Sequence, residues 1–197
     1  MNNRPQADAT VRRGRLKLLL IAVFFAAPVV LAWLAYRFDW ATGSAGNYGE
    51  LLAPAALPDG ALVAVDGRPF PLARLRGNWV LLQFDDSRCD TYCEQKLYFM
   101  RQVRRALGRD MERVERLWVL TDGGTPRASL VEAIEGTHLA RSADGRFAAA
   151  FPAARSPADH IYLVDPMGNL MMRFPREPDP SKMLKDLRRL LKYSQIG

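Results

Sequence analysis

A single run of residues near the N-terminus limits what this 197-residue chain can fold into. From Leu18 to Tyr36 the sequence has 19 consecutive residues without a charged side chain. As an α-helix this run would be about 28 Å long, close to the roughly 30 Å of a bilayer's hydrocarbon core. We therefore expect residues 18–36 to form one transmembrane helix and the rest of the chain to fold outside the bilayer.

The charges that precede this run predict its orientation. One acidic residue, Asp8, is outnumbered there by five basic ones, which are Arg4, Arg12, Arg13, Arg15 and Lys17. Because positive flanks stay in the cytoplasm, we expect residues 1–17 to be a cytoplasmic basic tail and the C-terminal part to lie across the membrane. The alternative is a cleaved secretory signal, whose apolar region would be roughly 7 to 15 residues long and followed at once by a cleavage site.

Composition indicates a bacterial source and an extracytoplasmic domain. Arginine outnumbers lysine 23 to 5, a bias typical of GC-rich bacterial genomes, so we expect a bacterial inner-membrane protein whose C-terminal domain is periplasmic. The formal net charge is +7, but the residues after 36 carry 23 basic and 20 acidic side chains. This near balance does not predict nucleic-acid binding.

The remainder of the sequence predicts a linker and one domain. Residues 37–58 are small, uncharged for the most part and rich in glycine and proline, which is typical of a linker; residues 59–197 suffice for one core. The expected elements are a hairpin around Asp66-Gly67, a strand at 79–84, a helix at 97–107, a strand at 117–120, a helix at 128–135, a hairpin of strands 161–164 and 170–174, and a helix from Asp179. This order predicts an α/β, thioredoxin-like mixed sheet flanked by helices.

The two cysteines of the chain, Cys89 and Cys93, lie at the predicted junction between the 79–84 strand and the helix that follows. Such a pair can form a structural disulfide, act as a redox dithiol or hold a soft metal ion. A purely structural bridge is disfavoured because so short a loop restricts little of the unfolded chain. Arg88 is expected to favour the thiolate form of Cys89, and Asp85 and Asp86 either bind a cation or tune the thiols, or belong to a capped, solvated loop.

The two histidines differ in their expected surroundings. His160 precedes the predicted strand 161–164, where a thioredoxin-like chain approaches the disulfide, so we expect its imidazole near the sulfurs; the alternative is a partly exposed residue at a strand edge. His138 lies in the polar stretch Gly136-Thr137-His138 and is expected in a surface loop.

These motifs resemble those of the Sco/SenC family over residues 60–192, with the N-terminal anchor in addition. The resemblance rests on the C-x-x-x-C spacing, on Phe84 five residues before Cys89, on the segment Leu120-Thr121-Asp122-Gly123-Gly124-Thr125-Pro126, and on Tyr162-Leu163-Val164-Asp165-Pro166-Met167-Gly168. It implies a membrane-anchored, thioredoxin-like protein that delivers copper to cytochrome c oxidase, with an oxidase subunit or its assembly factors as partners.

The resemblance also implies a copper site of two cysteines and one histidine. Cys89 and Cys93 would be two of the ligands, and Pro157 stands where the family has its histidine, five residues before Tyr162. We expect His160 to supply the imidazole instead. Two alternatives stay open: a thiol–disulfide reductant that uses Cys89 and Cys93 on oxidase or other extracytoplasmic cysteines, and a non-catalytic thioredoxin-like scaffold in an oxidase assembly complex.

Overall fold

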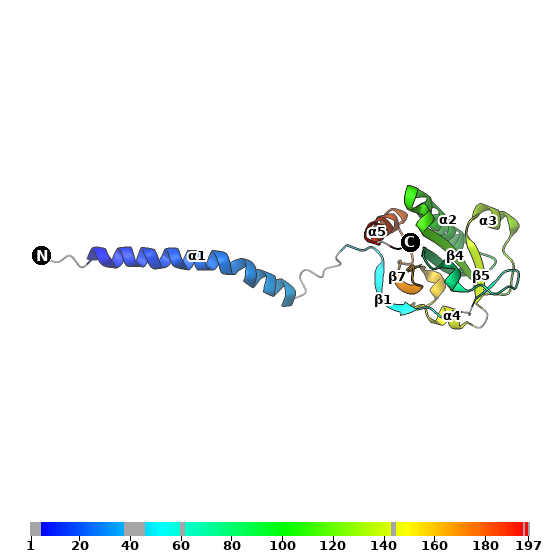
Figure 1. The fold of residues 1–197 in the computed structure, drawn as a ribbon, viewed down its shortest axis with the longest axis horizontal. Coiled ribbons are helices and arrows are strands. Elements are labelled where there is room, and N and C mark those ends of the chain that lie inside the picture. Colours follow the sequence, from blue (N-terminus) through cyan, green and yellow to red (C-terminus); the bar gives the residue numbers. More distant parts are fainter. Residues whose placement is uncertain (1–4, 38–45, 60–61, 143–144, 195, 197) are drawn as a thin grey trace. The chain divides into compact units, whose positions relative to one another are not determined.

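The computed structural model describes residues 5–37, 46–59, 62–142, 145–194 and 196. The chain divides into two compact units, Met1–Gly46 and Asn47–Gly197, and Figure 1 shows the elements of both. The first unit contains the N-terminal helix, and the second contains a sheet with its covering helices.

Helix α1 (Pro5–Arg37) contains the apolar run. Its segment Arg15–Ala35 has a mean hydropathy of 2.7, and none of it is buried against protein. Apolar side chains exposed around a whole helix suit a hydrocarbon environment, where Pro28 is also tolerated. Among the described residues α1 is the one helix long and apolar enough to cross a membrane, by length and composition.

A seven-stranded sheet with the order β1-β7-β6-β3-β4-β5-β2 forms the centre of the second unit. Its strands are β1 (Glu50–Ala56), β2 (Leu62–Ala64), β3 (Trp79–Asp85), β4 (Val114–Leu120), β5 (His138–Ser142), β6 (Ile161–Val164) and β7 (Asn169–Arg173). The pairs β3–β4 and β4–β5 are parallel, and all other pairs are antiparallel. The mixed sheet that the sequence predicts is thereby confirmed, with β3 near its middle.

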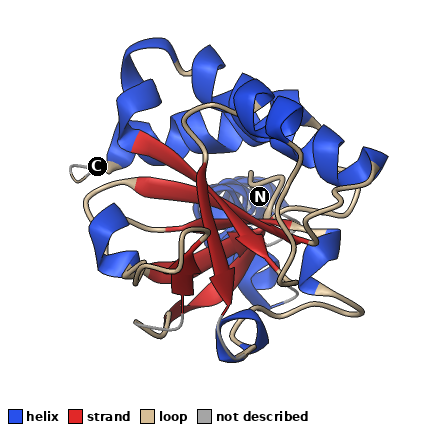
Figure 2. Cartoon of the chain, turned by 90° about the vertical axis from the view of Figure 1, so that its right-hand side faces the viewer, coloured by secondary structure: helices blue, strands red, loops and turns tan. Residues whose placement is uncertain are grey.

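Helices lie on both faces of this sheet, as Figure 2 shows. The helices are α2 (Thr91–Ala106), α3 (Ala128–Ala133), α4 (Arg146–Ala149) and α5 (Pro180–Tyr193), and short 3-10 turns form at Leu72–Leu75, Gly108–Arg113 and Pro157–Asp159. The longest two are each preceded by a capping aspartate: the side chain of Asp90 accepts from the Cys93 amide, and that of Asp179 accepts from the amides of Ser181 and Lys182. An aspartate side chain just before a helix accepts hydrogen bonds from backbone amides of the first turn, which have no acceptor within the helix.

The residues of β3 alternate between two cores. Trp79 and Leu81 pack with the apolar faces of α2 and α5, whereas Val80, Leu82 and Phe84 pack on the opposite face, with Phe147 and Phe151 among others. A strand buried on both faces needs apolar side chains at consecutive positions. This requirement explains why the 79–84 run was recognisable in the sequence.

The structure differs from the predicted linker of residues 37–58, because this segment contains β1. Strand β1 pairs with β7, with Glu50 opposite Arg173 and Leu51 opposite Met172. Six of its seven side chains are exposed, so the segment lacks the alternation by which strands are recognised. Backbone pairing holds it to the sheet, and the compact unit therefore begins at Asn47 instead of residue 59.

Two further expectations are wrong in their local detail. His138 begins strand β5 instead of lying in a loop; it is half-buried, and its Nε2 lies 3.3 Å from a carboxylate oxygen of Glu115. The turn at Asp66-Gly67 does form, with Gly67 at a φ of +83°, but the chain after Phe70 turns into the 3-10 segment Leu72–Leu75. The first predicted hairpin is therefore only a short bridge between Val63 and Pro69.

Asp186 fastens the start of the second unit to α5. It is only 2% exposed, and its Oδ2 accepts hydrogen bonds from the amides of Tyr48 and Gly49, both at 2.8 Å. A Cβ at Gly49 would lie 2.4 Å from the sulfur of Met172, so the backbone can approach this closely only with glycine. The carboxylate thus orders the residues that lead into β1.

We predict that Asp186→Ala lowers the free energy of unfolding by about 3 kcal/mol, because two amides lose a charged acceptor and the Gly49 amide is buried. Denaturant unfolding of the detergent-solubilised chain, followed by tryptophan fluorescence, measures this loss. Lys185→Ala, an exposed position on the same helix, is the control and should change the free energy by less than about 0.5 kcal/mol. Equal effects of the two substitutions would contradict the assigned role.

Candidate functional site

Cys89 and Cys93 meet where β3 ends and α2 begins. Their sulfurs form a disulfide, with the two Cα atoms 5.1 Å apart. Asp90, which follows Cys89 and caps the start of α2, accepts from the Cys93 amide at 2.8 Å. The structure therefore brings together both cysteines that the sequence singled out, at the predicted strand-to-helix junction.

The loop before Cys89 is fixed by aspartate side chains. Asp86 Oδ1 accepts from the amides of Arg88 and Cys89, and Asp122 accepts from the amide and hydroxyl of Ser87, at 2.9 and 2.7 Å. Cys89 itself has a φ of +48°, a left-handed conformation that is uncommon outside glycine and is often found at functional sites. The expectation of a solvated loop holds for Asp86, whose carboxylate orders this turn.

The charges beside the cysteines are compensated locally. Arg88 is highly exposed and forms an ion pair with Asp86, and the Arg88 hydrogen bond lowers the pKa of the Asp86 carboxyl. Glu94, in the first turn of α2, forms an ion pair with Arg127. Arg88 is therefore directed at Asp86 in this structure, and it is the α2 N-terminus that offers partial positive charge to the sulfurs.

The disulfide is buried. Cys89 is 2% exposed and Cys93 is fully covered, and both belong to an apolar cluster whose other buried members are Leu97, Trp118, Leu120, Leu130 and Ile134. A reductant, a metal ion or a partner thiol can reach these sulfurs only when part of the covering layer moves. The site is thus a closed form of the dithiol.

Gln83 is a polar residue within the otherwise apolar centre of β3. It is fully buried, and its Nε2 donates to Cys93 Sγ at 3.7 Å. Its Oε1 has no hydrogen-bond partner among the described residues. A buried amide costs free energy unless it is paired, so Gln83 is placed to respond to the charge state of the Cys93 sulfur.

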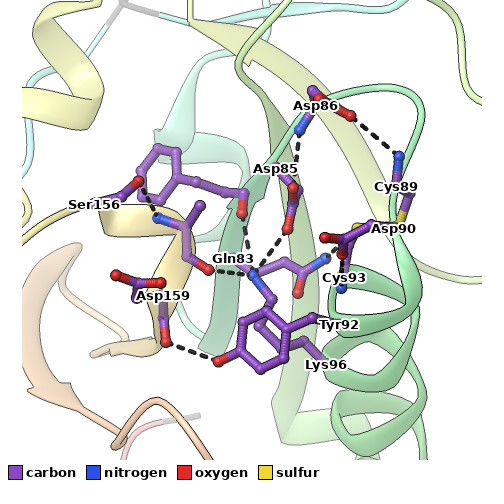
Figure 3. Close-up of polar contacts among 12 residues, drawn as sticks. Gln83, Asp85, Asp86, Cys89, Asp90, Tyr92, Cys93, Lys96, Ser156 and Asp159 are labelled. Atoms are coloured by element: carbon purple, nitrogen blue, oxygen red, sulfur yellow. Dashed lines mark hydrogen bonds and ion pairs between the residues drawn. A yellow bond between two sulfur atoms is a disulfide. The ribbon is translucent and has the colours of Figure 1, made fainter.

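Lys96 is a second buried polar residue at this site, and Figure 3 shows how it reaches across from α2. Its Nζ donates to Asp85 Oδ2 at 3.0 Å and to the carbonyl oxygens of Phe84 and Ala158, at 3.3 and 2.5 Å. Burial lowers the pKa of Lys96, and Asp85 opposes that shift. Burial likewise raises the pKa of Asp85, and Lys96 opposes it. Asp85 is therefore a structural ion-pair partner.

Tyr92, between the two cysteines in sequence, contacts a different segment. Its hydroxyl is shared between the backbone carbonyls of Asp159, at 2.9 Å, and Arg176. Lys96 Nζ lies 5.0 Å from its ring centroid, within the range of a cation–π interaction. Tyr92 and Lys96 together hold the 157–159 turn against the first turns of α2.

His160 follows this turn, but the structure does not bring it into a ligand group with the cysteines. Gln83 is paired with Ile161, so Ile161 shares the Cys93 face of the sheet while His160 and Tyr162 face the other way. Ring contact between His160 and Tyr162, at 5.9 Å, agrees with this placement. Among the described residues no group of three His, Cys, Asp or Glu side chains is arranged to hold a metal ion.

Sequence reasoning missed Gln83, Lys96 and Tyr92. A signal was present for Gln83, because an amide interrupts an apolar run. Lys96 precedes Leu97 on the buried stripe of α2, where a lysine is unexpected. Nothing in the sequence indicates that the Tyr92 hydroxyl reaches backbone more than 60 residues away.

Known proteins resemble this chain in sequence. Residues 79–194, over half of the chain, match the family described as transmembrane-like, thioredoxin-like, C-terminal domain. A segment of 111 residues is 34% identical to the protein SCO2 homolog, mitochondrial, of Mus musculus; it covers 54% of this chain and 43% of the mouse protein. The chain thus spans less than half the length of this relative. The similarity confirms the Sco-like resemblance that the sequence motifs predict.

Solved structures show the same fold. Apo Sco1 from Thermus thermophilus has a TM-score of 0.58 and 19% identity, over 75% of this chain and 99% of that one. Bradyrhizobium japonicum ScoI, solved with copper bound, has a TM-score of 0.51 and 22% identity, over 68% of this chain and 99% of that one. These likenesses confirm the thioredoxin-like fold.

We predict that Tyr92 ionises late in alkaline titration. Burial, followed by the Asp159 carboxylate, raises the pKa of Tyr92 from 10.0 to about 12. Because the pKa is raised in the folded state, the stability that it contributes is complete below pH about 10 and is lost as the pH rises through about 12. Burial also raises the pKa of Tyr162 to about 12, so phenolate absorbance should show two late tyrosines.

Substitution of single tyrosines separates these two ionisations. Tyr92→Phe should remove one late ionisation, whereas Tyr98→Phe, at a side chain 56% exposed, should leave both. Two late ionisations in Tyr92→Phe would contradict the contacts described for this hydroxyl.

Proposed function

The chain belongs to the transmembrane-like, thioredoxin-like C-terminal domain family, and from this premise we propose that it is a membrane-anchored, copper-handling assembly factor for a respiratory cytochrome c oxidase. The observation that carries the proposal is the Cys89–Cys93 pair, which lies where central strand β3 meets α2. The similarity to SCO2 over 111 residues gives the pair its expected role.

Copper binding by this pair begins with reduction. A partner dithiol supplies the two electrons and two protons that convert the disulfide into two thiols and is itself oxidised to a disulfide; Cu(I) then binds the two thiolates, for which it has high affinity, and the thiol protons pass to water. The α2 N-terminus favours the thiolate form of residues beside it. In this mechanism Asp90 keeps α2 started at the cysteine loop, and Asp86 keeps the loop in the turn that presents Cys89.

His160 is our candidate for the third ligand. Its Nδ1 lies 2.8 Å from the carbonyl oxygen of Phe174, so in the neutral ring Nδ1 carries the proton and Nε2 has a free lone pair. Metal-bound imidazoles usually have such a partner on the second nitrogen. Because His160 faces away from Cys93 in the closed form, the ligand role requires that the 157–160 segment turns towards the sulfurs when the disulfide opens.

A second function, thiol–disulfide exchange on oxidase or other extracytoplasmic cysteines, is favoured by one specific observation. The described site holds two sulfurs and no third metal-binding side chain. A reductant needs no more than these: the thiolate of one cysteine attacks a client disulfide, and the other cysteine then displaces the client thiol and closes the bridge. Two electrons pass to the client in this exchange.

We further propose that the protein is a single-pass protein of the bacterial inner membrane, with residues 1–17 in the cytoplasm and the sheet domain in the periplasm. The apolar segment of α1 supports the anchor, and the basic residues before it support the orientation. An oxidising periplasm fits a domain whose two cysteines are bridged. An oxidase subunit or an oxidase assembly factor is the proposed partner.

We predict that the reduced, detergent-solubilised chain binds one Cu(I) per chain, measured by anaerobic loading and metal analysis. Cys89→Ser should abolish binding, because one thiolate cannot form the two-coordinate site. His160→Ala should remove Cu(II) absorption and leave much of the Cu(I) binding, because imidazole matters more for Cu(II). His138→Ala is the control and should change neither.

The same experiment decides between the two functions. A reduced wild-type chain that binds no copper, yet reduces a model disulfide with loss of its own thiols, would overturn copper handling in favour of thiol–disulfide exchange. Copper binding that His160→Ala leaves wholly unchanged would remove His160 from the ligand set.

We also predict that a reporter enzyme active only in the periplasm is active when fused after Gly197, and that the purified protein retains residues 1–36. Reporter activity and N-terminal sequencing measure these outcomes. An inactive fusion, or a mature N-terminus near residue 45, would contradict the proposed anchor.

A further inference from the structure

Four arginines line a pocket that is separate from the cysteine site. They are Arg101, Arg104 and Arg105 on the second half of α2 and Arg116 on β4, and the Glu135-Gly136 turn forms another wall. The pocket has a volume of about 310 Å³. None of these residues takes part in the function proposed above.

Arg116 is the unusual member of this cluster, because its guanidinium is buried and only partly paired. Its side chain is 3% exposed. Nη2 donates to the carbonyl oxygen of Glu135 at 2.6 Å, while Nε and Nη1 are buried and have no hydrogen-bond partner among the described residues. Unpaired N–H groups of a buried cation are costly, so a well-folded chain normally supplies an acceptor.

The turn next to Arg116 leaves room for its guanidinium. Gly136 has a φ of +78°, and a Cβ there would lie 3.1 Å from Arg116 Nη2. A side chain at this position would strain the turn and press on the guanidinium. The backbone is thus shaped around a buried arginine that faces the pocket.

Arginines dominate the charge around the pocket, although Glu135 also lines it. Within the described part of the chain no carboxylate forms an ion pair with any of the four arginines, and Arg104 donates its Nε to the carbonyl oxygen of Val114. Burial, followed by the charges of Arg104 and Arg101, lowers the pKa of Arg116 to about 10, and Glu115 opposes this shift. Arg116 is still a cation at neutral pH, so four like charges converge on one small space.

We propose that this pocket binds a phosphate group. Guanidinium groups match phosphate oxygens with two parallel hydrogen bonds, and a tetrahedral anion can accept from several arginines at once. The unpaired N–H groups of Arg116 supply buried donors, and Arg101 and Arg105 add charge at the mouth. The phosphate is either a free inorganic ion or part of the headgroup of an anionic phospholipid.

Calorimetric titration of the full-length chain tests this site. The chain is solubilised in a neutral detergent without phosphate or sulfate, and the two probes are sodium phosphate and glycerophosphoglycerol, the headgroup of phosphatidylglycerol. We expect one binding site per chain for at least one probe. Tighter binding of inorganic phosphate identifies a free ion, and tighter binding of glycerophosphoglycerol identifies a lipid headgroup.

Substitutions locate the binding. Arg101→Gln and Arg105→Gln change residues on the surface of α2 and should each weaken binding about tenfold, as expected for loss of one charge-assisted contact. Arg116→Gln should weaken it most, although this buried change also affects folding. Arg155→Gln, at an exposed residue outside the pocket, is the matched control and should leave affinity unchanged.

Three outcomes would overturn the proposal. The first is no binding of either probe at millimolar concentration, which would mean that water alone pairs Arg116. The second is equal weakening by Arg155→Gln and Arg101→Gln, which would mean non-specific attraction. The third is unchanged affinity in both Arg101→Gln and Arg105→Gln. None of these measurements involves copper or the cysteines, so this proposal and the proposed function fail independently.

Discussion

The buried ammonium group of Lys96 joins the three segments that form the cysteine site. It reaches from α2 to the end of β3, through Phe84 and Asp85, and to the 157–159 turn, through Ala158. A buried cation is stable only when carboxylate and carbonyl oxygens replace its hydration. Removing any one of these acceptors leaves charge uncompensated, so the strand end, the helix start and the turn are constrained to keep one arrangement.

This arrangement explains how the cysteine site is kept closed and which features favour its opening. The apolar cluster around the sulfurs excludes water, which protects the disulfide from uncontrolled exchange. Cys89 sits in a left-handed conformation, and Gln83 has an unpaired carbonyl oxygen beside Cys93. Both features cost free energy in the closed form. The packing around the cysteines therefore keeps the site closed, although its local geometry is not ideal. Because opening the site relieves these two unfavourable features, they lower the free energy that opening requires.

The sequence predicts the middle of the domain better than its edges, for a physical reason. Strands β3 and β6 are buried on both faces and are apolar at almost every position, with Gln83 as the interruption in β3, and α5 shows its buried face at helical spacing. Strand β1 has mostly exposed side chains, and β5 is half-buried, so neither shows a clear apolar pattern in the sequence. Hydrogen bonds between backbones hold both strands in the sheet. The cysteines were placed correctly because they stand between a strand-like and a helix-like segment. Lys96 and Tyr92 contact backbone that is distant in the chain, and no local sequence pattern encodes such contacts.

The place of His160 in the chain fixes how this residue, the third ligand in our proposal, lies relative to the sulfurs. Residue 160 has extended backbone angles and leads directly into β6, so the alternation of the strand fixes its side and places it with Tyr162, away from Cys93. Position 157 lies in a 3-10 turn that Lys96 and Tyr92 hold against α2, and a side chain there is not bound by this alternation. An imidazole at position 157 would belong to a turn held against α2, whereas the imidazole at position 160 lies on the sheet face opposite Cys93. Only a rearrangement of the turn, which the Lys96 contacts oppose, returns it to the sulfurs. The copper site that we propose, with His160 as its third ligand, thus depends on how strongly Lys96 holds Ala158 once the disulfide is open.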